Sequence, residues 1–158
     1  MAQSKTNAMR ILDSAHIDYK THSYQSKDGA IDGVSVAQKL GIPVSQVFKT
    51  LVTQGADREY FVFVVPVAEE LDLKKAARAV SEKNVEMLHL KDLNRVTGYI
   101  RGGCSPVGMK KQFRTVFHAS CLDVPAILVS AGKIGLQMEV APSDLIALIG
   151  AQTEDIIK

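Results

Sequence analysis

The sequence predicts an α+β domain with a curved, barrel-like, mainly antiparallel mixed sheet that is flanked by helices. Three observations predict this class. Short runs rich in β-branched residues recur along the chain, two neighbouring runs are joined by one tight turn, and amphipathic stretches with capping residues lie between the others. A chain of 158 residues fits one domain with one continuous core, so residues 1–158 are expected to form a single unit.

The helices are predicted by apolar residues at helical spacing and by residues that favour helix ends. The predicted stretches are residues 4–15, 32–41, 71–80, a turn before Gly98, and 142–150. Ser4 or Thr6 can cap the first helix, in which Ala8 and Leu12 recur four residues apart, with Ala15 on the same face and Met9 near its edge. Asp32 precedes the second helix, and Pro142 opens the last one.

The strands are predicted by short β-rich runs that Gly, Pro and polar clusters interrupt. These runs are residues 16–24, 46–53, 60–67, 85–90, 115–119, 126–130 and 136–140. The turn between residues 46–53 and 60–67 makes an antiparallel hairpin the simplest connection. Lys49 lies in the first strand of this hairpin on the side opposite Phe48, where a lysine usually meets solvent.

The composition is that of a soluble globular protein, with 46% hydrophobic and 23% charged residues. No apolar run is long enough to cross a bilayer and none reads as a secretory signal, which predicts a cytoplasmic protein. Cys104 and Cys121 are expected to be free thiols. The four histidines show no paired spacing with each other or with the cysteines, so neither a metal nor another cofactor is predicted.

Charge is unevenly distributed along the chain. Residues 71–114 hold ten Lys or Arg and four acidic residues, a net charge of +6, while the remaining residues sum to −4. Such a basic segment suits a polyanion, because lysine and arginine neutralise phosphates. A solvated helical surface explains the same charges equally well.

Two glycine-containing stretches could bring backbone amides close to a ligand. Residues 99–111 contain Gly102, Gly103 and Gly108, which predicts an irregular loop able to cradle an oxyanion or phosphate. Residues 130–135, which begin with Ser130, are a second candidate, although by itself this stretch favours a hairpin turn with an exposed Lys133. A simple turn-rich connection is the alternative for the first stretch, and Cys104 has no histidine at a recognisable offset that would activate it.

Five segments, taken together and in order, resemble the YbaK/EbsC family of aminoacyl-tRNA deacylases. They are THSY (21–24), QVFKTLV (46–52), VPVAEELDLKKAARA (65–79), TGYIRGGCSPVGMKK (97–111) and VSAGKIGLQMEVAPSDL (129–145). Together they span nearly the whole chain. No single segment is specific for the family by itself, but the five segments in the family's order are.

The resemblance implies which residues form the site. The lysine of the family's V-[FY]-K-T-L motif corresponds to Lys49, with Thr50 beside it, and the resemblance assigns Lys49, Ser130 and Gly102 to catalysis. It implies that the substrate is also bound by Tyr24, Thr50, Gly103 and Gln137. Relatives that act on Cys-tRNA(Pro) often have an aspartate where this chain has Gln137, and a glutamine supplies neither a negative charge nor a proton acceptor of that kind.

The resemblance also implies a reaction and partners. It predicts removal of mischarged cysteine from tRNA(Pro), in which the cysteine thiol attacks its own ester and leaves as a thiolactone. Prolyl-tRNA synthetase is the implied protein partner, supplying recognition of tRNA identity that the basic segment cannot provide. Two alternatives stay open: a water-dependent deacylase for Ala-tRNA(Pro) or another small aminoacyl group, and a non-catalytic RNA-binding module.

Overall fold

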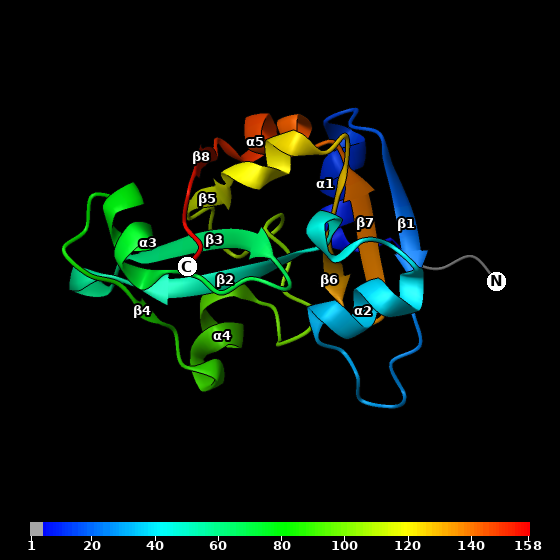
Figure 1. The fold of residues 1–158 in the computed structure, drawn as a ribbon, viewed down its shortest axis with the longest axis horizontal. Helices are drawn as coiled ribbons and strands as arrows, with labels where there is room; N and C mark the ends of the chain where they lie inside the picture. The colour runs from blue at the N-terminus through cyan, green and yellow to red at the C-terminus, as the bar shows by residue number, and fades with distance from the viewer. Residues whose placement is uncertain (1–4) are drawn as a thin grey trace.

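Two β-sheets joined near Val47 form the frame of the protein, whose structure is a computed structural model that describes residues 5–158. The smaller sheet has the order β1-β7-β6 and the larger one β4-β2-β3-β5-β8. Figure 1 shows the long β2–β3 hairpin crossing the middle of the molecule, with the smaller sheet at one end and α3 at the other. The α+β class and the mainly antiparallel, mixed pairing are confirmed, although the strands form two sheets and not one closed barrel.

The strands are β1 (Tyr19–Ser23), β2 (Phe48–Gln54), β3 (Tyr60–Pro66), β4 (Glu86–Met87), β5 (Arg114–His118), β6 (Ile127–Lys133), β7 (Leu136–Val140) and β8 (Gln152–Glu154). The hairpin predicted for residues 46–67 is confirmed, with Lys49 opposite Val65. Only β5 pairs in parallel, with β3 on one side and β8 on the other. A single parallel bridge between Val47 and Leu128 connects the two sheets.

The helices are α1 (Asn7–Ser14), α2 (Gly33–Leu40), α3 (Leu73–Ala79), α4 (Leu90–Thr97) and α5 (Pro142–Ile149), with 3-10 turns η1 (Val44–Gln46), η2 (Ala56–Arg58) and η3 (Ala119–Asp123). Their ends follow the capping residues. Asp32 accepts a hydrogen bond from the Ser35 amide at 3.1 Å, and Gly41 ends α2 in the left-handed conformation. All five helical stretches predicted from the sequence are therefore confirmed.

The first helix is shorter than predicted. Thr6 caps it by accepting a hydrogen bond from the Met9 amide at 3.2 Å, while Ser4, the other predicted cap, lies outside the described residues. Met9 is buried in the core, whereas Ala15 follows the last helical residue and is exposed. His16 then adopts a φ of 59°, which turns the chain and delays β1 until Tyr19.

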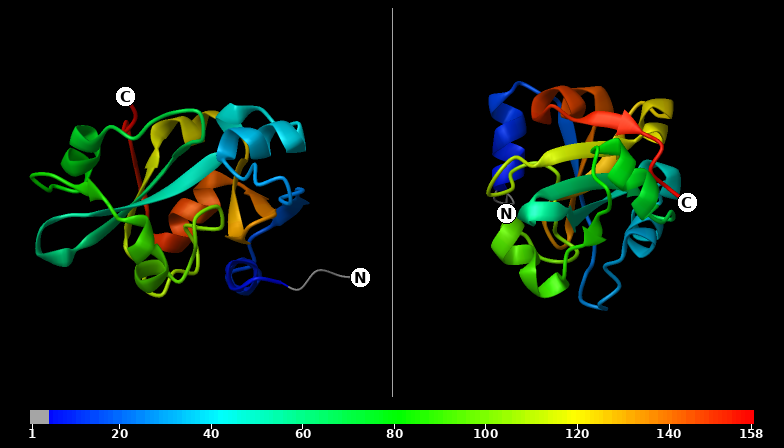
Figure 2. Two further views of the ribbon diagram at one scale, coloured as in Figure 1. Left: turned by 90° about the horizontal axis from the view of Figure 1, so that it is seen from below. Right: turned by 90° about the vertical axis from the view of Figure 1, so that its left-hand side faces the viewer.

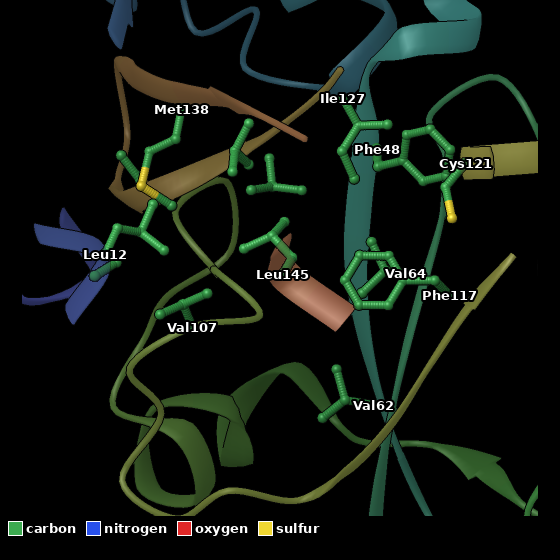
Figure 3. Close-up of a cluster of buried hydrophobic side chains, with 14 of the residues drawn as sticks. Leu12, Phe48, Val62, Val64, Val107, Phe117, Cys121, Ile127, Met138 and Leu145 are labelled. Atoms are coloured by element: carbon green, nitrogen blue, oxygen red, sulfur yellow. The ribbon is translucent and has the colours of Figure 1, made fainter. Parts of the chain in front are cut away.

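The main core lies between the two sheets and beneath α1 and α5. Figure 3 shows Leu12, Met138 and Leu145 pointing toward one another, with Phe48 and Phe117 beside them. A second cluster packs α3 against the opposite face of the larger sheet, through residues such as Val65. The hairpin is thus covered on both faces, and Figure 2 shows the helices distributed around it.

The strand β8 was not predicted from the sequence. Its three residues read Gln-Thr-Glu, with no apolar alternation, and they add to the edge of the larger sheet by pairing with β5. Arg114 holds this edge by donating to Gln152 Oε1 at 3.0 Å from one guanidinium nitrogen. A polar edge strand is specified by its long-range partners, which period-two patterning cannot detect.

Candidate functional site

A cavity of about 790 Å³ opens along one edge of β2, between the Val47–Leu128 bridge, where the two sheets meet, and the pairing of Thr53 with β4. Its walls include residues 29–36 around the N-terminus of α2, residues 47–52 at the start of β2, the segment from β4 into α4, the loop around Gly102, and residues of β6 and β7. Five of the seven site residues predicted from the sequence line it, namely Lys49, Thr50, Gly102, Ser130 and Gln137. Tyr24 and Gly103 do not.

The cavity faces the edge of β2 and not one of its faces. Successive side chains of a strand point to opposite faces, yet all residues from 48 to 52 line the cavity. The Val67 amide donates to the Val47 carbonyl, which continues the β2–β3 register. In an antiparallel pair every second residue hydrogen-bonds to the partner strand, so the odd-numbered residues of β2 direct their backbone groups toward β3. The backbone N–H and C=O of Thr50 therefore point away from β3, toward the open edge.

Lys49 lies at this edge with its side chain partly buried. Within residues 5–158 its ammonium group makes no hydrogen bond or ion pair. The charge of Lys49 also affects the nearby carboxylate of Glu70. The pKa of Glu70 is lowered, chiefly by a hydrogen bond from Lys158 and by the charge of Lys158, and to a smaller extent by the charge of Lys49. The Lys49 ammonium is thus free to bind an anion or a developing negative charge.

Ser130 and Gln137 form a polar pair at the far side of the cavity. They are cross-strand partners in the β6–β7 hairpin, so their side chains lie on the same face, and each is only 7% exposed. The Ser130 hydroxyl oxygen accepts a hydrogen bond from the Gly132 amide at 3.1 Å, which fixes the irregular end of β6. The Ser130 hydroxyl can still donate its proton to a ligand.

Two buried oxygens in the cavity wall have no protein partner. Thr50 Oγ1 and Gln137 Oε1 are both inaccessible and unpaired in the part of the chain that the structure describes. A buried polar atom without a hydrogen bond costs about 1–3 kcal/mol, so such atoms in a cavity wall usually meet a ligand or water. Both can accept a hydrogen bond, and the Thr50 hydroxyl can also donate one.

The loop around Gly102 brings the backbone against the cavity. The Gly103 amide donates to the Ile100 carbonyl at 3.0 Å, which closes a turn with Gly102 at a φ of 85°. Gly103 itself is buried against the backbone of Lys133 and does not reach the cavity. Of the two amides predicted to face a ligand, only that of Gly102 is left for this role.

Tyr24 lies outside the cavity. Its amide donates to the Gly135 carbonyl, and the ammonium nitrogen of Lys39 lies 6.0 Å from its ring centroid. Lys39 also donates to the carbonyls of Gln25 and Ala30, which tethers the loop that carries the cavity residue Ile31. The Tyr24 hydroxyl is buried without a partner. Tyr24 is therefore linked to this loop through Lys39 and does not itself line the cavity.

Sequence reasoning missed two further parts of the cavity wall. Arg101 lines the cavity and is exposed, and its position directly before the two glycines was a signal that could have identified it. Met87 and Leu90 also line it, and both are exposed apolar residues. No sequence signal marks them, because their exposure depends on tertiary packing.

Of the two cysteines, Cys104 lines the cavity, and its environment keeps its thiol protonated. Burial raises the pKa of the Cys104 thiol to about 12. Below that pH the neutral thiol predominates, and a neutral thiol is a poor nucleophile. Both cysteines are free, as expected from the sequence.

Replacing Cys104 by alanine is therefore expected to leave kcat/KM for deacylation within about twofold of the parent protein. The measurement is the initial rate of aminoacyl ester loss at pH 7.5, with the folded Lys49→Ala variant as the inactive reference. A loss of two orders of magnitude in Cys104→Ala would show that the protein thiol takes part in the reaction.

Residues 5–158 contain no group of three or more His, Cys, Asp or Glu side chains placed to hold a metal ion. Within the same range no helix has the length and apolarity needed to cross a bilayer.

Comparison with known proteins assigns most of the chain to one family. Residues 31–148 match the aminoacyl-tRNA editing domain family. An Enterococcus faecalis protein, assigned as the Cys-tRNA(Pro)/Cys-tRNA(Cys) deacylase EbsC, is 49% identical over 98% of this chain and 94% of its own length.

Solved structures share the fold. One assigned as a trans-editing enzyme for prolyl-tRNA synthetase is 25% identical, with a TM-score of 0.83 over 98% of this chain and 99% of that one. The crystal structure of a hypothetical protein, 19% identical, has a TM-score of 0.86 over 94% of this chain and 97% of that one, and shows the fold alone. The chain therefore belongs to the aminoacyl-tRNA editing domain family, as its resemblance to YbaK/EbsC proteins predicted.

Proposed function

We propose that this protein is a trans-editing deacylase that removes mischarged cysteine from tRNA(Pro). The observation that carries the proposal is the cavity on β2, where an unpaired lysine, a backbone turn at Gly102 and unpaired buried oxygens surround a space with no activated protein nucleophile. The family match and the name of the E. faecalis relative support the same reaction class.

The cavity suits a reaction in which the substrate supplies the nucleophile. The cysteine sulfur attacks its own ester carbonyl, a sulfur–carbon bond forms, and the bond from the carbonyl carbon to the ribose oxygen breaks. The thiol proton ends on that ribose hydroxyl, and the cysteine leaves as a thiolactone. The protein needs only to orient sulfur against carbonyl and to stabilise negative charge on oxygen.

The residues of the site divide this work according to their chemistry. The Lys49 ammonium stabilises the developing oxyanion or holds the terminal phosphate, and the Gly102 amide and Ser130 hydroxyl donate to the aminoacyl carbonyl. Thr50 and Gln137 line the cavity, and a rotation of each side chain that exposes its unpaired oxygen lets it accept a hydrogen bond from the amino or thiol group of the aminoacyl moiety. Gln137 binds these groups without adding a negative charge.

Residues 1–158 act as one domain in this proposal. The family match begins at residue 31, yet α1 places Ala8 and Leu12 in the same core as the matched strands. The exposed basic residues of α3 and α4 hold the tRNA backbone, and prolyl-tRNA synthetase supplies recognition of the rest of the tRNA. The setting is the cytoplasm, where aminoacyl-tRNA is used.

A water-dependent deacylase for Ala-tRNA(Pro) is the second candidate, and Gln137 is the observation that favours it. A neutral side chain in place of the aspartate common in cysteine-specific relatives weakens any interaction that needs a negative charge. An alanyl group has no thiol, so its removal would require an ordered water in the cavity.

The test compares deacylation of Cys-tRNA(Pro) and Ala-tRNA(Pro) by the purified protein under identical conditions. We expect Cys-tRNA(Pro) to lose its aminoacyl group at least tenfold faster in kcat/KM, since only cysteine carries the internal nucleophile. Faster loss of alanine would support the second candidate. Stoichiometric binding of both tRNAs without ester loss over hours would show a non-catalytic module.

A further inference from the structure

The segment that leads from β4 into α4 presents four apolar side chains to the cavity: Met87, Leu88, Leu90 and Leu93. Leu88 and Leu93 are partly buried and pack against the main core. Met87 and Leu90 are 44% and 58% exposed. We call Met87 and Leu90 the apolar shelf.

The packing of the fold does not account for this shelf. The Leu88 amide donates to the Val52 carbonyl at 3.0 Å, which fixes the segment against β2, and α4 begins two residues later. Leu88 and Leu93 already supply the contacts with the core. Of the six large apolar side chains that are exposed in residues 5–158, Met87 and Leu90 are the two that line the cavity.

Cations share the cavity with the shelf. Arg101 is exposed and lines the same cavity as Leu90. Lys49, whose ammonium has no partner in residues 5–158, also lines it and lies on β2 three positions before Val52, to which the segment is anchored. A ligand that uses both features needs an apolar planar face and a nearby negative charge. A nucleotide has both, because its base offers a flat face and its phosphate an anion.

We infer that the apolar shelf holds the base of the terminal nucleotide of the aminoacyl-tRNA, with Arg101 near its phosphate. The inference rests on the proposed function and extends it to a part of the substrate that does not react. The cysteine side chain does not need the shelf, because it is small and the buried pair Ser130 and Gln137 surrounds the inner part of the cavity. The exposed shelf is left for the larger nucleoside.

This contact positions the substrate without reading tRNA identity. Contact between a base and an apolar side chain depends little on sequence, since every base has a flat face, and all tRNAs end in the same nucleotide. Met87 and Leu90 are thus positioning residues. Their loss should weaken binding of the nucleotide and leave the reacting groups of the cavity in place.

The first measurement is an NMR titration that determines how tightly the protein binds adenosine 5′-monophosphate and, separately, ribose 5-phosphate. The matched variants are Leu90→Ser, Met87→Ser with Leu90→Ser, and the control Leu122→Ser, because Leu122 is also 58% exposed but lies outside the cavity. We expect the double variant to weaken binding of adenosine 5′-monophosphate by on the order of tenfold. The affinity for ribose 5-phosphate should stay unchanged in all variants. In the control Leu122→Ser the affinities for both ligands should stay unchanged.

If the parent protein and the double variant bind adenosine 5′-monophosphate equally tightly, the inference is wrong. It is also wrong if the double variant loses the same affinity for adenosine 5′-monophosphate and for ribose 5-phosphate. This readout needs no turnover, so it separates the shelf from the proposed function, which fails if the parent protein does not deacylate Cys-tRNA(Pro). A second assay compares cysteinyl esters of adenosine and of a base-free ribose analogue. A loss in the double variant that appears only when prolyl-tRNA synthetase is added would make the shelf a protein-docking surface and overturn the inference.

Discussion

Replacing Lys49 by alanine is expected to lower kcat/KM for deacylation of Cys-tRNA(Pro) by on the order of 10²–10³-fold. Lys49 supplies an ammonium group that is unpaired within the described chain and lies at the cavity edge of β2. A donor or cation aimed at the developing oxyanion acts in a partly enclosed site, where its interaction is stronger than in water. The measurement is the single-turnover rate of cysteine release at several protein concentrations.

The same substitution should leave the fold intact. Because Lys49 makes no hydrogen bond or ion pair in residues 5–158, its removal leaves no partner unsatisfied, and the free energy of unfolding should change by less than about 1 kcal/mol. Lys20→Ala is the matched control: it removes the same charge from an exposed position on β1, outside the cavity. A folded Lys49→Ala protein that keeps most of its activity would remove Lys49 from the mechanism.

Replacing Gly102 by alanine is expected to reduce activity by on the order of tenfold to a hundredfold. At a φ of 85° a side chain strains the backbone, and a Cβ atom would come within 2.8 Å of Ile31 Cδ1 and 3.3 Å of Ile134 Cγ1. Ile31 also lines the cavity, so it and the Gly102 turn would both shift. A misplacement of about 1 Å at the aminoacyl carbonyl is enough for a loss of this size.

Gly41→Ala separates the two effects of that substitution. Gly41 ends α2 at a φ of 68°, and a Cβ atom there would meet nothing within 4 Å. Both variants should lose about 1–2 kcal/mol in the free energy of unfolding from the left-handed backbone, but only Gly102→Ala should lose activity as well. Denaturant unfolding and the deacylation rate, measured on both variants, give the comparison. Equal activity in the two variants would mean that the Gly102 turn does not position the substrate.

The helices and the central hairpin could be predicted because their signals are local. Asp32 and Gly41 bound α2, Pro142 opens α5, and the β-rich runs on either side of the turn at Gly55 predict the β2–β3 pairing. The order of strands in the larger sheet could not be predicted, since β3 pairs in parallel with the distant β5. Such pairing depends on long-range packing, and the short polar strand β8 depends on it entirely.

The candidate site was predicted less completely than the fold. Periodicity alone assigns Lys49 to a solvated face, and family resemblance was needed to select it. The structure adds the reason for its availability: the cavity wraps around a strand edge, so Lys49 and Thr50 both line it although they lie on opposite faces of β2. Gly103 and Tyr24, which the resemblance assigned to substrate binding, do not line the cavity, because tertiary packing places them outside it.

The identity of the product released from Cys-tRNA(Pro) tests the central claim most directly, namely that the cavity around Lys49 uses the substrate's own thiol. The reaction should be quenched early in acid and analysed by mass spectrometry, because a thiolactone contains one water fewer than free cysteine. We predict that the thiolactone is the first product and that an S-methylated cysteinyl ester is not cleaved. Free cysteine as the first product, together with cleavage of the S-methylated ester at a similar rate, would contradict this mechanism.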